Sequence, residues 1–424
     1  MGITRRDLIK ATGAGVALGG IGFPSALWSA QKTVKIGFLA PLTGEVAAWG
    51  LPGLYGCEIW AENVNAAGGV KIGGESYNVE FVSFDNEYLP DKALQGMKKL
   101  VAEDGAKFVM MLGGDTWPAV QRFATRSKML TSTLLPSDLS PDSPYHVAPC
   151  EVHPIYNVTG VDYLADQFPD AKTAVIAAQN DALGLPSVAT YRAAFEARGI
   201  EILDENIFDP ATADFAPVVT SLLSKKPAIF CLDTCYADYV NLITEQLFHQ
   251  GFEGKIISCT FDNYHDVIDK TSKEFVEGFV FQFPDFDDPA LNDDNINFAE
   301  PDAFFEEFNK RHPGNWSAVA WEYASIMELW KQAAERAASI EPMDVLEAMK
   351  EGGSAAHVFG TAAWWGEDLW GIDNALVGNW PVVTIQDGRA RIVENRSIPD
   401  WWAKNQDLLV KHMEALKLMH YQQG

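Results

Sequence analysis

Residues 33–70 read TVKIGFLAPLTGEVAAWGLPGLYGCEIWAENVNAAGGV and contain the first strand-loop-helix unit of the chain. The first eight residues are mostly apolar and predict a buried strand, which a loop with a proline and a glycine follows. A helix is expected from about Leu51 to Asn65, and Gly68 and Gly69 end it. Units of this kind build parallel sheets.

The same alternation continues along the chain. After the first unit, strands are predicted at 77–85, 107–112 and 129–135, with helices at 91–104 and from about Trp117. A second series starts after Pro154, with strands predicted at 172–178, 200–208, 227–233 and 255–260 and a helix in each gap. Strands that alternate with helices imply parallel sheets covered on both faces, so two series predict two doubly wound α/β lobes.

The last third of the chain has a different pattern. Helices are expected at 301–314 and 315–337, followed by a hairpin of strands 380–388 and 389–394 that turns at Asp387-Gly388. These elements must pack on lobes already formed, so several crossovers are predicted. Lobe 1 is expected to contain residues 33–150 and about 285–370, lobe 2 residues 151–284 and about 371–395, and a C-terminal helical extension residues 396–424.

The N-terminus resembles an export signal. Residues 4–10, TRRDLIK, form a twin-arginine pattern, and a weakly apolar run rich in Gly and Ala follows to about residue 30. Such a segment predicts export by the twin-arginine route, so residues 1–30 are expected to be removed and the mature protein to be periplasmic.

Charge and cysteine content narrow the possible partners. The chain has 424 residues and a formal net charge of −26, which argues against nucleic acid and anionic membranes as partners. Five cysteines are an odd number, and no histidine lies near Cys231 and Cys235 in sequence, so small core residues are favoured over zinc ligands. No metal or cofactor is expected.

The stretch AKFVMMLGGDTWPAV, residues 106–120, places polar groups where an α/β fold binds ligands. Asp115, Thr116 and Trp117 follow a buried strand and two glycines, at the start of the next helix. In open parallel sheets the ligand lies outside the carboxyl ends of the strands, against the N-termini of helices. We therefore expect these three residues at a binding site.

The first unit resembles the periplasmic Leu/Ile/Val-type (type I) solute-binding proteins of ABC transporters. The matching positions are Pro41, Thr43, Gly44, Trp49, Gly50, Asn65, Gly68 and Gly69, and the similarity continues to about Glu394. The resemblance implies a ligand in the cleft between two lobes, hinge closure around it, and the membrane permease of an ABC transporter as partner. It implies no enzymatic activity and leaves the ligand open.

The resemblance also implies candidate ligand-binding residues. In lobe 1, Trp49 is expected to cover the ligand, Asp115, Thr116 and Trp117 occupy the loop that binds a ligand carboxylate, and Ser137 lies in a second such turn. In lobe 2 the corresponding residues are Leu183, Tyr236 and Asp262, the last near the acid that binds an ammonium group. Each has a plainer structural alternative, such as a helix cap for Thr116, a core position for Trp117 and an ordinary turn for Asp262.

Two kinds of ligand fit these residues. An amino acid or similar zwitterion would place its ammonium group against a carboxylate and aromatic rings, and its anionic end at the helix start. An aromatic or other carboxylic acid would be held by Trp49, Trp117 and Tyr236, with Ser137 at its carboxylate. The acid ligand requires that Asp115 point away from the cleft, because two anions repel each other.

Enzymatic motifs are absent from the sequence. It contains no G-x-S-x-G elbow, no H-E-x-x-H and no P-loop, and its eight histidines are scattered. A ligand-sensing receptor of the same fold is a further alternative, which the export pattern disfavours. The sequence therefore predicts the solute-binding protein of an ABC importer.

Overall fold

The first sheet is built from the N-terminal third of the chain. In the computed structural model, which describes residues 32–233 and 235–422, its strand order is β2-β3-β1-β4-β5-β6. The strands are β1 (Lys32–Ala40), β2 (Val70–Ile72), β3 (Glu75–Asp85), β4 (Phe108–Met111), β5 (Thr131–Ser132) and β6 (His146–Val147). Apart from the short antiparallel β2, neighbours pair in parallel, and helices α1 (Ala47–Ala66), α2 (Pro90–Lys98) and α3 (Trp117–Arg126) connect them. The predicted export signal lies outside the described residues.

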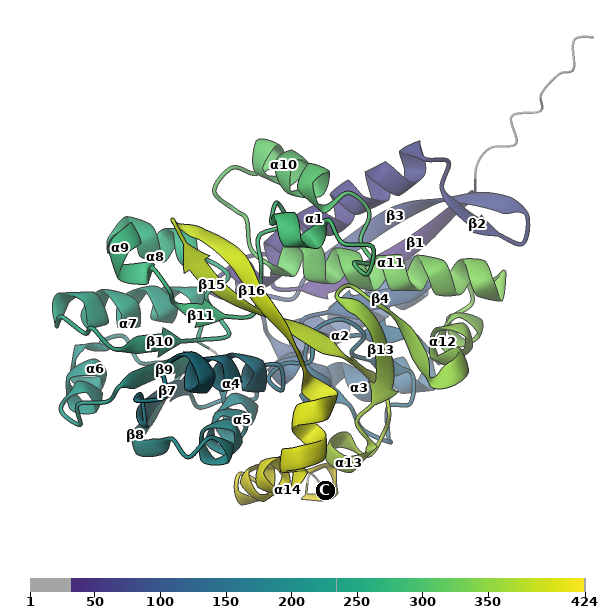
Figure 1. Cartoon of the computed structure of the whole chain (residues 1–424). Coiled ribbons are helices and arrows are strands. Elements are labelled where there is room, and N and C mark those ends of the chain that lie inside the picture. Colours follow the sequence, from purple (N-terminus) through teal and green to yellow (C-terminus); the bar gives the residue numbers. More distant parts are fainter. Residues whose placement is uncertain (1–31, 234, 423–424) are drawn as a thin grey trace, which may run out of the picture. The chain divides into compact units, whose positions relative to one another are not determined.

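The second sheet has the order β16-β15-β11-β10-β9-β7-β8 (Figure 1). Its strands are β7 (Thr173–Gln179), β8 (Glu201–Phe208), β9 (Ile229–Asp233), β10 (Lys255–Ile257), β11 (Val280–Phe281), β15 (Asn379–Gln386) and β16 (Arg389–Ser397). Its helices are α4 (Asn157–Gln167), α5 (Gly184–Ala197), α6 (Ala216–Leu223), α7 (Ala237–His249), α8 (Tyr264–Lys270) and α9 (Lys273–Val276). The β15–β16 hairpin joins the parallel strands as an antiparallel edge, and it turns at Asp387-Gly388 as predicted.

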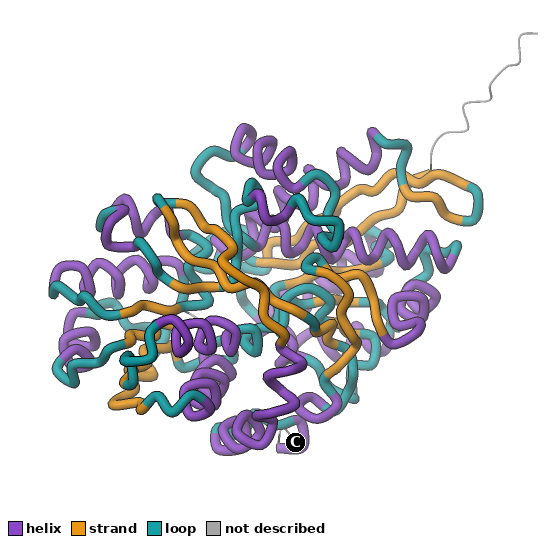
Figure 2. The backbone as a smooth tube through the Cα atoms, in the orientation of Figure 1, coloured by secondary structure: helices purple, strands orange, loops and turns teal. Residues whose placement is uncertain are grey.

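The chain returns to the first sheet after β11. Helices α10 (Pro301–Arg311), α11 (Val319–Ala337), α12 (Pro342–Lys350) and α13 (Glu367–Trp370) belong to this part, with a small antiparallel sheet of β12 (Ser354–His357), β13 (Gly360–Trp365) and β14 (Ala375–Val377). Helix α11 packs closely on α1: a Cβ atom on Gly56 would lie 2.2 Å from the Ala320 carbonyl oxygen. Figure 2 shows the helices in purple around both groups of orange strands.

A buried carboxylate fixes the crossover that follows β11. Asp285 is 1% exposed and accepts hydrogen bonds from the Tyr264 hydroxyl (2.7 Å), the Trp316 indole N–H (3.1 Å) and Arg389 Nε (3.1 Å). Tyr264 and Arg389 belong to elements of the second sheet, whereas Trp316 precedes α11. This residue therefore ties the crossover to elements on both of its sides.

Residues 396 and 397, which were expected in the C-terminal extension, belong to β16, and a helix follows them. Helix α14 (Ile398–Ala415) begins after Ser397, whose hydroxyl accepts the N–H of Asp400, and it packs on α5. Lys411 pairs with Glu196 of α5. Within the described ranges, no helix has both the length and the apolar composition needed to cross a bilayer.

Candidate ligand-binding site

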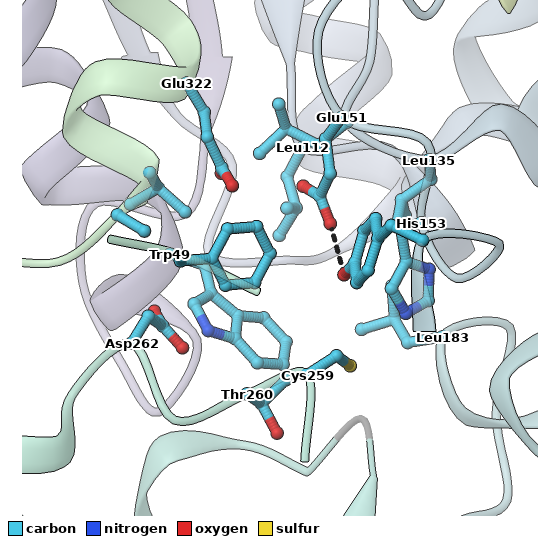
Figure 3. A pocket seen from close by; sticks show the side chains of 15 residues that line it. Trp49, Leu112, Leu135, Glu151, His153, Leu183, Cys259, Thr260, Asp262 and Glu322 are labelled. Carbon is cyan, nitrogen blue, oxygen red and sulfur yellow. Dashed lines mark hydrogen bonds between the residues drawn. The ribbon is translucent and has the colours of Figure 1, made fainter. Parts of the chain in front are cut away.

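A cavity lies at the carboxyl ends of strands from both sheets (Figure 3). Its volume is about 50 Å³. The lining comes from the start of α1, the loops after β4, β5, β7, β10 and β11, the crossover after β6, and the N-terminus of α11. The residues are Trp49, Leu112, Leu134, Leu135, Glu151, His153, Tyr156, Leu183, Cys259, Thr260, Asp262, Phe283, Ala318, Val319 and Glu322. This is the position where an open parallel sheet binds its ligand.

Three buried carboxyl groups line the cavity, and no lysine or arginine does. Glu151 accepts a hydrogen bond from the Tyr156 hydroxyl at 2.7 Å, and Asp262 accepts one from the Ser317 hydroxyl at 2.7 Å. Glu322 is 1% exposed, and its Oε1 has no hydrogen-bond partner among the residues that the structure describes. A buried oxygen of this kind is costly unless something pairs with it.

Burial favours the neutral form of all three acids. It raises the pKa of Glu151 to about 8, to which the nearby charge of Asp262 contributes, and it raises the pKa of Asp262 to about 6. The pKa of Glu322 is raised well above its ordinary value by burial, and Glu151 and Asp262 raise it further. Burial lowers the pKa of His153 to about 3, so this imidazole is neutral. Near neutral pH, Glu151 and Glu322 of the free cavity therefore hold protons, whereas Asp262 is mostly ionised.

This charge state predicts a pH effect on stability. Because the pKa of Glu322 is raised in the folded protein, its stabilising contribution is complete below the unfolded-state pKa and is lost as pH rises. The Glu322→Gln variant does not titrate at this position. As the pH rises from 5 to 8, the free energy of unfolding of wild type should therefore fall relative to that of the variant, by up to about 1.4 kcal/mol per pH unit. Thermal midpoints of both proteins across this range test the effect, and parallel curves would contradict it.

Three of the residues expected from the sequence line the cavity: Trp49, Leu183 and Asp262. Tyr236 lies directly behind them, because its ring packs edge-on against Trp49 with 5.7 Å between the ring centroids. Trp49 belongs to α1, on the first sheet, and Tyr236 precedes α7, on the second. The contact therefore bridges the two halves of the fold.

The other expected residues lie elsewhere. Asp115, Trp117 and Ser137 line a separate, larger pocket, and the buried Thr116 donates its hydroxyl proton to the carbonyl of Gly113 at 2.8 Å. The Trp117 indole stacks on His146, with 3.6 Å between the ring centroids. These four residues are not brought together with Trp49 and Asp262 in one cavity.

The backbone amides at this loop are already engaged. Gly114 N–H donates to Asp138 Oδ2 at 2.9 Å, and Asp115 N–H donates to the Tyr88 hydroxyl at 3.3 Å. The Asp115 carboxylate accepts the backbone N–H of Ala182, which lies just before α5. The polar groups of this loop therefore make contacts within the chain, and these contacts connect the two halves of the fold.

Sequence reasoning missed Glu151, Tyr156 and Glu322 as cavity residues. The sequence pattern could have predicted Glu322 as a functional residue, because it is the single acid in the mostly apolar helical segment 318–327. Glu151 lies in a connection between the two series of strands, where no periodicity marks it. Among the described residues, no group of three or more His, Cys, Asp or Glu side chains is arranged to hold a metal ion.

Comparisons with known proteins agree with this architecture. A family model described as periplasmic binding protein matches residues 33–390. A Leu/Ile/Val-binding protein homolog 1 of Brucella suis biovar 1 (strain 1330) is 28% identical over 375 residues, which are 83% of this chain and 91% of the relative.

Solved structures show the same fold at low identity. A leucine-binding protein of Thermotoga maritima MSB8 has a TM-score of 0.71 at 17% identity, over 87% of this chain and all of that one (100%). A solute-binding protein of R. palustris in complex with 4-hydroxybenzoate has a TM-score of 0.69 at 18% identity, over 87% of this chain and 99% of that one.

Proposed function

The chain belongs to the periplasmic binding protein family of ABC transporters, and we propose that it binds a small solute with a positively charged nitrogen in the cavity described above. The observation that carries this proposal is the set of three buried carboxyl groups without a lysine or arginine among the lining residues. An ammonium group supplies the missing charge and hydrogen-bond donors. Amino acids and similar zwitterions, the ligands expected from the sequence, belong to this class.

The binding mechanism is closure of two lobes. In this proposal lobe 1 contains residues 33–150 and about 285–378, lobe 2 residues 151–284 and about 379–397, and the residues that follow form an extension; the expected bounds move because β14 pairs with β13 and β16 ends at Ser397. Support comes from the two sheets and from the contact of Trp49 with Tyr236 across them. A ligand stabilises the closed form only by the contacts it gains on closure, and this cavity offers contacts from both lobes.

A carboxylic acid, aromatic or otherwise, is the second candidate. Asp115 does not line the cavity, as an acid ligand requires, and Trp49, Tyr156 and Phe283 offer aromatic surface. Acids that retain their protons can donate hydrogen bonds to a ligand carboxylate. A carboxylate next to three carboxyl groups, however, would favour retention of those protons, so this binding should weaken as pH rises.

The proposal includes a location outside the cytoplasm and a permease as partner. The twin-arginine pattern at residues 4–10 supports export of the folded protein. Outside the cytoplasm, the loaded protein delivers its solute to the permease of an ABC importer. A receptor role for the same fold would need a signalling partner in place of a permease.

A thermal-shift screen of the mature protein tests the function. The panel contains amino acids, simple amines, amides, betaines, and aromatic and aliphatic acids, each at millimolar concentration and pH 7. A ligand present at 100 times its dissociation constant should stabilise the fold by about 2.7 kcal/mol. Shifts with solutes that carry a positively charged nitrogen are expected. Shifts with acids alone would favour the second candidate, and no shift with any class would contradict a binding role.

A further inference from the structure

Among the described residues that line the cavity, three carry carboxyl groups and none carries a cationic side chain. Glu151, Asp262 and Glu322 face the same space from three different segments, and their carboxyl groups lie around the Trp49 indole (Figure 3). Glu322 Oε1 is buried without a hydrogen-bond partner among the described residues, although it borders the cavity. An ammonium N–H is the donor that this oxygen lacks.

Aromatic rings form a further part of the wall. Trp49, Tyr156 and Phe283 line the cavity, and the rings of Tyr156 and Phe283 meet edge-on with 5.3 Å between their centroids. The faces of aromatic rings attract organic cations, particularly where water is excluded. Leu112 and Leu183 add apolar surface for the body of a ligand.

Two helix starts near the cleft are capped by acidic side chains of the protein itself. At the first, the N–H of Gly114 donates to Asp138. At the second, the start of α5, the N–H groups of Leu183 and Gly184 donate to Asp181 Oδ1 at 3.0 and 2.8 Å. These amides are the groups that would receive a ligand carboxylate, and they are already occupied by acidic side chains.

From this arrangement we infer that the preferred ligand is a small organic cation without a carboxylate group, namely a primary or methylated amine, with its nitrogen next to Glu322 and Asp262 and its apolar part against Trp49. The inference rests on the proposed function and narrows its ligand class. Among the described residues that line the cavity, a carboxylate would meet three acids and no cationic side chain. The cation takes the place of a proton on one of the acids, and this proton leaves to solvent, so charge is balanced on binding.

Matched sets of ligands test the inference. One set is 3-methylbutylamine, leucine and 4-methylpentanoate, and a second is 2-phenylethylamine, phenylalanine and 3-phenylpropanoate; choline and glycine betaine form a third pair. Titration calorimetry with the mature protein should show at least one cation that binds tenfold or more tightly than its carboxylate-bearing partner. Tighter binding of an amino acid, a betaine or an acid would overturn the inference and leave the proposed importer function standing. Failure of every cation would also overturn it.

A variant of the unpartnered acid provides a second test. Glu322→Gln should weaken binding of the best cation at least tenfold, whereas Glu347→Gln, an exposed position on α12, should not change it. Titrations in two buffers of different ionisation enthalpy should show proton release by the wild-type protein and less release by Glu322→Gln. If Glu322→Gln does not fold, Asp262→Asn replaces it in both measurements. Unchanged affinity and unchanged proton release in the folded variants would overturn the inference.

Discussion

Replacement of Trp49 by alanine is expected to weaken ligand binding at least tenfold. The indole lines the cavity and packs against Tyr236 of the opposite half of the fold. The variant loses an attraction between the ring and a cation of about 0.5 to 2 kcal/mol and an aromatic contact of about 0.5 to 1.5 kcal/mol. About 1.4 kcal/mol corresponds to a tenfold change in the dissociation constant, and both losses together, about 1 to 3.5 kcal/mol, exceed this value over most of their range.

A second tryptophan of the same helix is the matched control. Trp60 is also buried in α1, but its indole N–H donates to Glu328 of α11 at 3.2 Å, far from the cavity lining. Trp60→Ala should lower the thermal midpoint and leave the affinity of the folded protein unchanged. Trp49→Ala should weaken ligand binding in addition to the loss of stability that follows from removal of its contact with Tyr236. Equal affinity of Trp49→Ala and wild type in titration calorimetry would remove Trp49 from the site.

The largest expected loss of stability follows from replacement of Asp285 by alanine. The carboxylate is almost fully buried and accepts hydrogen bonds from Tyr264, Trp316 and Arg389, so its removal leaves three donors without their acceptor. A buried donor left without an acceptor costs about 1 to 3 kcal/mol, so the loss of the acceptor of Tyr264 and Trp316 should cost about 2 to 6 kcal/mol. Urea denaturation should therefore show a lower free energy of unfolding by this amount, with little change in its dependence on urea concentration.

The neighbouring acid provides the comparison for this loss. Asp287 pairs with Arg389 and Arg391, but its side chain is 30% exposed. Exposed ion pairs contribute about 0 to 1 kcal/mol, so Asp287→Ala should destabilise the protein much less than Asp285→Ala. Similar losses in both variants would show that the buried network does not stabilise the crossover as described.

The strand-helix alternation was predictable because each buried strand is apolar along its length and each flanking helix has its own periodicity. The strand predicted at 129–135 was too long: only Thr131 and Ser132 pair in the sheet. Beyond them, the Thr133 hydroxyl bonds to the Leu112 carbonyl and to Asp138, which bends the chain away from a ladder. Helix α4 was missed because Gly160 and several β-branched residues weaken its helical pattern.

The binding site could be predicted only in part, because some of its residues are distant in the sequence. Trp49 and Asp262 were expected at the ligand because neighbouring motifs resemble a known family, and both line the cavity. Glu151 and Glu322 lie 171 positions apart in the sequence and meet only because the chain crosses between the sheets. No local pattern encodes such a meeting. Asp115 and Ser137 remain predictions, since their loops line another pocket.

A crystal structure of the mature protein with its tightest-binding amine would test the central claim most directly. We predict that the nitrogen lies within hydrogen-bond distance of Glu322 or Asp262, that Trp49 covers the ligand, and that residues of both lobes contact it. A ligand bound at the loop of Asp115 and Ser137, with no atom in the cavity lined by Glu322, would contradict the account.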